Sequence, residues 1–140
     1  MRIIAGQARG RKLNTLPGDN TRPTLDRTRE ALFNILQTRV FDAQVLDLFA
    51  GSGALALEAL SRGAESAVLC DKSAEACKVI RQNIDAVRVS EKAQLMNCEA
   101  QAAAKRLAGR KFDLIFLDPP YHLWLVDEAL RDIVQNDLLA

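Results

Sequence analysis

Hydrophobic and polar residues follow two periodicities along most of the chain. From residue 44 onward, short apolar runs of strand length are followed by segments whose apolar residues recur at helical spacing. Strands that alternate with helices in this way are typical of an α/β domain with a parallel sheet. The predicted strands cover residues 45–49, 66–70, 94–97 and 112–117. The predicted helices cover 54–61, which Gly63 ends, a segment that Ser73 can cap and that runs to about 87, then 100–107 and 123–136.

The first 40 residues have a different pattern. Residues 2–5 and 11–15 resemble two short strands around a turn at residues 6–10, and the Pro17-Gly18 pair that follows requires a loop. Thr24 can cap a helix over residues 25–38. We therefore predict a hairpin and helix extension at residues 1–40, followed by an α/β domain at residues 41–140.

Charge is distributed unevenly, although the net charge is only +1. Residues 1–30 carry seven basic side chains against three acidic ones, whereas the rest of the chain carries twelve against fifteen. A basic arm on a mildly acidic body suggests contact with a phosphate backbone, because each basic group near a phosphate can release condensed counterions. A solvated surface arm is the alternative that charge alone leaves open.

Other compositional features exclude several classes of protein. No apolar run approaches the roughly 18 residues of a membrane span, and Arg2 follows the initial methionine, so we expect a cytoplasmic protein without membrane contact. Cys70, Cys77 and Cys98 form no CxxC pair, and His122 is the single histidine. We therefore expect no metal site, and we expect the three cysteines to be small buried residues.

A glycine-containing turn closes the first predicted strand. The segment 47–53, Asp-Leu-Phe-Ala-Gly-Ser-Gly, ends that strand and opens a helix, and bare backbone at Gly51 and Gly53 can approach a ligand closely. Ala56 stands where a third glycine would complete the dinucleotide fingerprint, and a lone GxG is also common in structural turns. The turn favours a nucleoside cofactor without requiring one.

Acidic residues at the ends of the first three strands support such a cofactor. Asp71 ends the second strand about 20 residues beyond the turn, where a carboxylate can accept hydrogen bonds from ribose hydroxyls. Asp47 lies inside an apolar strand, and a ligand with a cationic or amine group would explain its burial. Glu99 and the backbone N–H of Ala100 follow the third strand and could bind an adenine. Helix-start roles for Asp71 and Glu99 remain the alternative.

The tetrapeptide Asp118-Pro119-Pro120-Tyr121 follows the fourth strand and forms a second candidate site. The two prolines remove N–H donors, so the Asp118 carboxylate and the Pro119 carbonyl form a rigid wall of acceptors. Such a wall can hold both N–H bonds of a base's exocyclic amine and direct its lone pair at a sulfonium methyl group. Tyr121 could stack on a flipped base. A structural turn is the alternative.

The nature of the acceptor gives a weak indication of the base. A carboxylate at Asp118 suits the adjacent N1–H and N2–H donors of guanine, whereas adenine presents an amine beside an acceptor nitrogen.

Trp124 is expected on the buried face of the last helix, where apolar residues surround it in sequence.

These motifs, in this order, resemble the class I S-adenosylmethionine (SAM)-dependent amino-methyltransferases. Four further segments resemble the bacterial RsmD family, which methylates the N2 amine of a guanine in 16S ribosomal RNA. These segments are Met1-Arg2-Ile3-Ile4-Ala5-Gly6, Gly10-Arg11-Lys12-Leu13, Thr21-Arg22-Pro23-Thr24 and Arg29-Glu30-Ala31-Leu32-Phe33-Asn34-Ile35-Leu36.

The resemblance implies an enzyme with a Rossmann-like fold that binds SAM and acts on 16S rRNA or a small ribosomal subunit particle. The resemblance also implies which residues bind the cofactor, which take part in catalysis and which contact RNA. The cofactor-binding residues would be Asp47, Phe49, Gly51, Gly53, Asp71, Glu99 and Ala100. The catalytic residues would be Asp118, Pro119 and Tyr121, and the RNA-binding residues would be Arg9, Arg11, Lys12 and Arg22.

The family fold has a seven-stranded sheet, and this sequence supplies four of those strands before ending near Leu138, where a fifth strand would start. We therefore expect either a fragment or a sheet edge that another chain covers. Three other functions remain open: adenine-N6 methylation of DNA or RNA, a nucleotide-dependent oxidoreductase, and a noncatalytic RNA-binding protein. The oxidoreductase would leave Asp118 and Tyr121 without a role.

Overall fold

Four of the apolar runs form one parallel sheet. In the computed structural model, which describes residues 1–16, 23–119 and 123–140, the strand order is β3-β2-β1-β4. The strands are β1 (Gln44–Asp47), β2 (Ser66–Asp71), β3 (Ala93–Asn97) and β4 (Leu114–Phe116). The chain proceeds outward from β1 to β3 and then crosses to the other side of β1, so the strand order reverses between β1 and β4. The predicted α/β class and the four parallel strands are confirmed.

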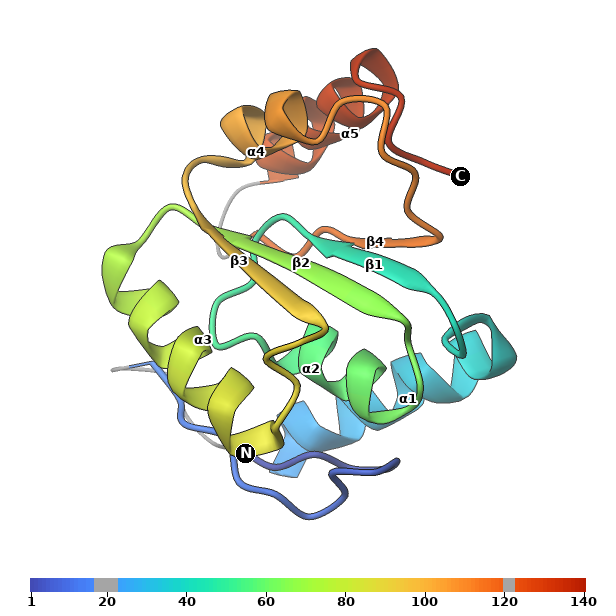
Figure 1. Cartoon of the computed structure of the whole chain (residues 1–140), viewed down its shortest axis with the longest axis vertical. Helices are drawn as coiled ribbons and strands as arrows, with labels where there is room; N and C mark the ends of the chain where they lie inside the picture. Colours follow the sequence, from blue (N-terminus) through green and yellow to red (C-terminus); the bar gives the residue numbers. More distant parts are fainter. Residues whose placement is uncertain (17–22, 120–122) are drawn as a thin grey trace.

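Helices cover both faces of this sheet (Figure 1). On one face lie α1 (Pro23–Leu36), α2 (Ala54–Ser61) and α3 (Ala74–Val87); on the other lie α4 (Ala100–Arg106) and α5 (Leu123–Gln135). A short 3-10 helix, Gln37–Arg39, follows α1. The bounds of α2 are those predicted, and α1 begins at Pro23, whose fixed φ suits the first turn of a helix. Thr24 therefore lies inside α1 and does not precede it as a cap.

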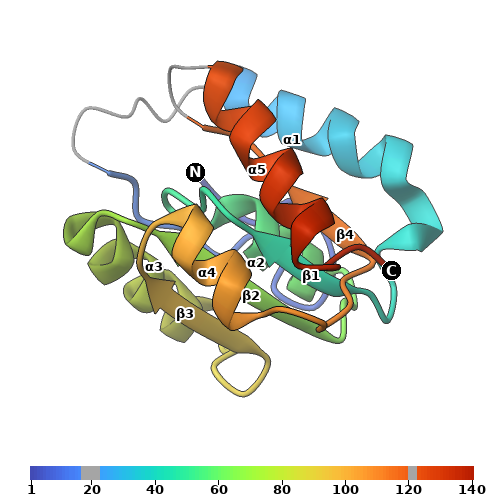
Figure 2. The same ribbon diagram turned by 90° about the horizontal axis from the view of Figure 1, so that it is seen from above.

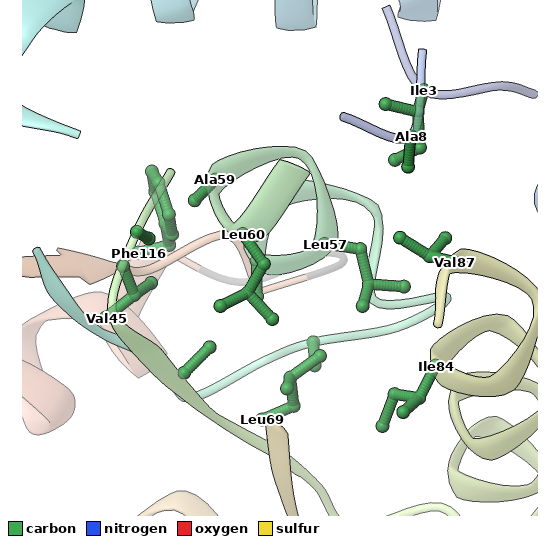
Figure 3. Close-up of a cluster of buried hydrophobic side chains, with 14 of the residues drawn as sticks. Ile3, Ala8, Val45, Leu57, Ala59, Leu60, Leu69, Ile84, Val87 and Phe116 are labelled. Carbon is green, nitrogen blue, oxygen red and sulfur yellow. The ribbon is translucent and has the colours of Figure 1, made fainter. Parts of the chain in front are cut away.

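Alternate residues of the inner strands pack into two separate cores, as a sheet covered on both faces requires. Val45 and Leu69 pack against Leu57 and Leu60 of α2 and against α3 (Figure 3). Their sequence neighbours face α4 and α5, where Leu46, Leu48, Val68, Cys70, Ala103, Ala104 and Ile133 form the second core.

The N-terminal arm, residues 1–16, is a tight antiparallel pair, as predicted, although it contains a single bridge between Arg2 and Lys12. The Ile3 N–H donates to the Arg11 carbonyl at 2.9 Å, and Leu13 donates to Met1 at 2.8 Å. Gly6 has a φ of +88°, and a Cβ there would lie 1.9 Å from the Ser61 carbonyl oxygen. The arm therefore docks on the end of α2 at a point where no larger residue fits.

A buried carboxylate, which the sequence pattern did not reveal, fixes this docking. Glu58 of α2 is fully buried. Its side chain accepts hydrogen bonds from the backbone N–H groups of Ile4 and Ala5 at 2.9 and 3.1 Å. It also forms ion pairs with Arg29 of α1 at 3.3 Å and with Arg62 at 2.9 Å. Arg29, counted above as part of a basic arm, is consequently buried and does not present its charge to a partner.

We expect Glu58→Ala to lower the free energy of unfolding by about 3 to 5 kcal/mol, because it leaves the buried Nε of Arg29 and two backbone N–H groups without their acceptor. Urea unfolding measures the change. Glu65→Ala, which removes an exposed carboxylate just after α2, is the matched control and is expected to change stability by less than about 0.5 kcal/mol. Equal effects of the two substitutions would contradict this role for Glu58.

Three expectations about the outer parts of the sheet are modified. The expected strand start after α5 is present in minimal form: Leu139 bridges Phe112 in parallel, and Leu138 is buried. Trp124 is 55% exposed, so its predicted place on the buried face of the last helix is wrong; Ala129 and Ile133 form that face. Cys70 and Cys77 are buried as expected, but Cys98 is half-exposed.

Candidate functional site

The predicted site residues gather at the carboxyl ends of the parallel strands. Asp47 and Asp71 are the last residues of β1 and β2, and Asp118 follows β4 by two residues. Asp47 pairs in register with Leu69 on one side and with Phe116 on the other. The glycine turn and the Asp118 corner therefore lie on the same rim, next to the reversal of strand order, which is where open α/β sheets bind ligands.

The two glycines of the turn serve different purposes. Gly53, with φ +85°, is the N-cap of α2, and a Cβ there would lie 3.2 Å from Leu69 Cδ2 in the core. Gly51 has a φ of +59°, and among the described residues other than itself and its two chain neighbours, no atom lies within 4 Å of the position where a Cβ would stand. Gly53 thus allows α2 to pack on the sheet, whereas Gly51 presents bare backbone to open space that a ligand can occupy.

Asp71 is held firmly beside this turn. Its carboxylate accepts hydrogen bonds from Gly51 N–H and from Ser73 N–H, both at 2.9 Å. Asn97, at the end of β3, donates its side-chain amide to the Asp71 carbonyl at 3.1 Å. Each carboxylate oxygen retains a lone pair, and the side chain is half-buried, so Asp71 remains able to accept from the hydroxyls of a ribose.

The third strand leads to a free acceptor and a free donor. Glu99 is the N-cap of α4 by its backbone conformation, but its side chain makes no capping hydrogen bond. The helix-start alternative therefore describes the backbone of Glu99 and leaves the exposed carboxylate available. Ala100 is the first residue of α4, so its N–H belongs to the first helical turn, where backbone donors have no acceptor within the helix.

Asp47 is the buried acid of the rim, with 1% of its surface exposed. Its carboxylate accepts one hydrogen bond, from Phe49 N–H at 3.1 Å. Burial raises the pKa of Asp47 from its ordinary value of 3.8 to about 7; the Phe49 hydrogen bond lowers it, and the negative charges of Asp118 and Asp71 raise it further. A buried carboxyl whose pKa is raised, beside two other acids, marks a candidate functional site, and a cation or an amine suits it chemically.

The second candidate site is described in part. Asp118 is exposed and Pro119 is half-buried, at the end of the strand that pairs with β1. Pro120, Tyr121 and His122 lie outside the described residues, and so does Arg22. Arg9, Arg11 and Lys12 are exposed on the arm, with the Arg11 guanidinium donating to the Ala86 carbonyl of α3 at 3.3 Å.

Sequence reasoning missed one polar residue next to the turn. Asn83 of α3 is fully buried, and its side-chain amide donates to the Ser52 carbonyl between the two glycines at 2.8 Å. The helical spacing of apolar residues in α3 could have revealed Asn83, because this residue falls on the apolar face of the helix, between Ile80 and Val87. A polar residue on such a stripe requires buried hydrogen-bond partners.

No membrane-spanning helix and no cluster of three metal-binding side chains occur among the described residues. An open hollow of about 410 Å³ lies between the arm and the carboxyl-terminal end of α3, and its lining includes Gln7 and Arg88 but none of the rim residues. The rim is the candidate site, because the polar residues at the ends of β1 and β2 and after β4 converge there.

The sheet order, the glycine turn and the acidic strand ends together define a Rossmann-like methyltransferase. Comparisons agree. The family model described as "Conserved hypothetical protein 95" matches residues 1–140. The ribosomal RNA small subunit methyltransferase D of Escherichia coli K12 is 40% identical over 140 residues, which cover all of this chain and 70% of that protein. The chain therefore belongs to this family, the RsmD family of methyltransferases.

Solved structures support the same fold. The structure of the E. coli protein yhhF has a TM-score of 0.88 and 41% identity, covering all of this chain and 75% of that one. An O-methyltransferase from Bacillus cereus, in complex with SAH, has a TM-score of 0.63 at 18% identity, covering 83% of this chain and 54% of that one. At that identity the second match supports the fold alone.

Proposed function

We propose that this protein transfers a methyl group from SAM to the N2 amine of a guanine in 16S ribosomal RNA. The observation that carries the proposal is that the two candidate sites share one edge of the sheet. Asp71 ends β2 on one side of β1, Asp118 follows β4 on the other side, and the glycine turn follows β1 between them. The name of the E. coli relative supports ribosomal RNA as the substrate. We propose that the reaction takes place in the cytoplasm. The experiment below decides whether the substrate is free 16S rRNA or a small-subunit particle.

The residues of the rim fit a SAM molecule. Asp71 would accept from the ribose hydroxyls, and Glu99 and the Ala100 N–H would meet the adenine. Bare backbone at Gly51, in the turn that Gly53 closes, would leave room for the ligand beside Phe49. Asp47, buried at the end of β1, would face the cationic part of the cofactor. When bound, SAM supplies an electrophilic methyl group on its sulfonium; the protein's task is to position it.

Asp118 and the Pro119 carbonyl would orient the target amine. The lone pair of an exocyclic amine is delocalised into the base, so two acceptors that hold its N–H bonds favour a tetrahedral nitrogen and direct the lone pair toward the methyl group. After transfer, the nitrogen loses one proton to Asp118 or to solvent. We propose that Tyr121 stacks on the flipped guanine. The N1–H and N2–H donors of guanine suit the Asp118 carboxylate better than the amine and acceptor nitrogen of adenine do.

The extension over residues 1–40 would hold the RNA. Arg9, Arg11 and Lys12 lie exposed on the arm, where their charges can pair with phosphates, and Arg22 precedes α1. We propose that these residues contribute to affinity for RNA and that the domain over residues 41–140 carries the chemistry.

The function is tested with labelled SAM and three substrates: 16S rRNA, small-subunit particles and DNA. Digestion to nucleosides after the reaction identifies the product. N2-methylguanosine from either form of rRNA is the expected result, and the better of the two identifies the substrate. Label found in N6-methyladenine would show that the target base is adenine and not guanine. Absence of label from all three substrates would contradict the proposal.

Cofactor binding is tested separately by calorimetry. We expect Asp71→Ala to weaken SAM binding about 10- to 100-fold, because a charged acceptor for two hydroxyls is lost together with the anchor of Gly51. Asp85→Ala, an exposed position on α3, is the matched control and should leave the affinity unchanged. If Asp71→Ala and the parent chain bind SAM with equal affinity, Asp71 does not contribute to cofactor binding.

A further inference from the structure

Asn83 joins the N-terminal arm to the glycine turn. Its side-chain oxygen accepts from the backbone N–H of Asn14 at 2.7 Å, and its amide donates to the Asn14 carbonyl at 3.0 Å. The same amide donates to the Ser52 carbonyl at 2.8 Å. One buried side chain therefore binds both peptide groups of an arm residue and the backbone of the turn between Gly51 and Gly53.

All of the hydrogen-bonding capacity of the Asn83 amide nitrogen is used in these contacts, because its two N–H bonds go to two different carbonyls. Asn83 has no exposed surface. A displacement of the turn must therefore either move the arm with it or leave a buried donor or acceptor without a partner, which is costly. The arm and the turn therefore share one buried hydrogen-bonding side chain.

The arm is also directed toward the rim. The Arg11 guanidinium contacts the Ala86 carbonyl, and the Asn14 side chain contacts Gln82, so residues 11–14 run along α3 toward its amino-terminal end. That end begins just after Asp71, at the cofactor side of the sheet. The basic residues of the arm therefore belong to a segment that passes beside α3 (Figure 2) and that is linked to the glycine turn through Asn14 and Asn83.

We propose that Asn83 is a positioning residue that couples cofactor binding at the turn to RNA binding by the arm. This inference rests on the proposed function. A ligand that orders the turn also orders Asn14 and the arm, so the cofactor raises the affinity for RNA, and RNA raises the affinity for the cofactor by the same factor.

The test measures the affinity of the chain for a 16S rRNA transcript with and without saturating SAH. We expect SAH to tighten RNA binding by at least about fivefold in the parent chain. In Asn83→Asp, which keeps the size of the side chain but replaces both donors with an acceptor, the ratio should fall to about one. Asn136→Asp is the matched control, because the amide of Asn136 donates within the end of its own helix to Asp132. Its ratio should equal that of the parent.

A second readout does not depend on RNA. Hydrogen exchange at the Asn14 amide should slow when SAH is added to the parent chain and should not respond to SAH in Asn83→Asp. Asn83→Leu, which keeps the approximate shape without adding charge, gives the same test if the aspartate variant does not fold. Asn14→Ala, which removes the contact with Gln82 and leaves the backbone contacts to Asn83, should retain the coupling.

The outcomes separate the inference from the function on which it rests. A fivefold ratio that persists in both Asn83 variants, or a ratio of one in a parent chain that binds both ligands, would overturn the coupling and leave the methyltransferase proposal intact. Failure of the parent chain to bind SAH would overturn the proposed function and the coupling together.

Discussion

Replacing Asp118 with alanine is expected to lower the rate of methyl transfer by about 10²- to 10³-fold, the loss typical when one preorganised electrostatic partner of a reacting group is removed. The physical reason is that Asp118 would hold an N–H bond of the amine and accept charge as the nitrogen becomes cationic. Single-turnover kinetics with labelled SAM and 16S rRNA measure the effect.

SAM binding should persist in Asp118→Ala, since the cofactor would be held on the other side of β1. The matched control is Asp113→Ala, the same substitution at the opposite end of the same strand, where the carboxylate accepts from Gln44 N–H at 2.8 Å. The control should retain the parent rate. A variant at Asp118 that transfers methyl groups as fast as the control would place the catalytic contact elsewhere.

Replacing Asp47 with asparagine is expected to stabilise the fold at neutral and alkaline pH while impairing function. The pKa of this carboxyl is 3.8 in its ordinary state and about 7 when folded. Between those values the folded protein holds a proton that the unfolded chain has released, so stability falls as the pH rises through this window, and the loss is complete above it. The difference in pKa corresponds to about 4 kcal/mol.

Asparagine does not titrate, so Asp47→Asn is expected to abolish this loss of folding stability at high pH. Urea unfolding of the parent and of Asp47→Asn at pH 4 and pH 8 should therefore show a relative gain for the variant of about 4 kcal/mol between the two conditions. The same measurement on Asp85→Asn, an exposed position, should show no such gain. If the stabilities of the parent and of Asp47→Asn change in parallel, the carboxyl of Asp47 has the same pKa in the folded chain as in the unfolded chain, and the expected rise in its pKa is contradicted. A gain in stability accompanied by weaker SAM binding would identify Asp47 as a residue kept for function.

The sequence allowed prediction of the features that depend on local pattern. The α2 bounds followed from the glycine turn before the helix and Gly63 after it, and Ser73 caps α3 by accepting from Ala76 N–H as its position suggested. The common rim followed from parallel strands, because their carboxyl ends meet at one edge. Strand β4 is shorter than predicted, since Phe112 forms its hydrogen bonds with Leu138 and Ala140 rather than with β1.

Features that depend on distant partners could not be predicted. Glu58 would be expected at a helix surface, and its partners Ile4 and Arg29 are 54 and 29 residues away. Asn83 and Asn14 are 69 residues apart. The spacing of apolar residues in α5 could not show which of its sides would meet α4, and Trp124 was therefore placed on the wrong one.

The docking of the first residues on α2 has a consequence for the order of events during synthesis. Ile4, Ala5 and Gly6 leave the ribosome before Glu58 and Ser61, which receive them and are made more than fifty residues later. The amino-terminal segment must therefore wait, without its partners, until the second helix has emerged.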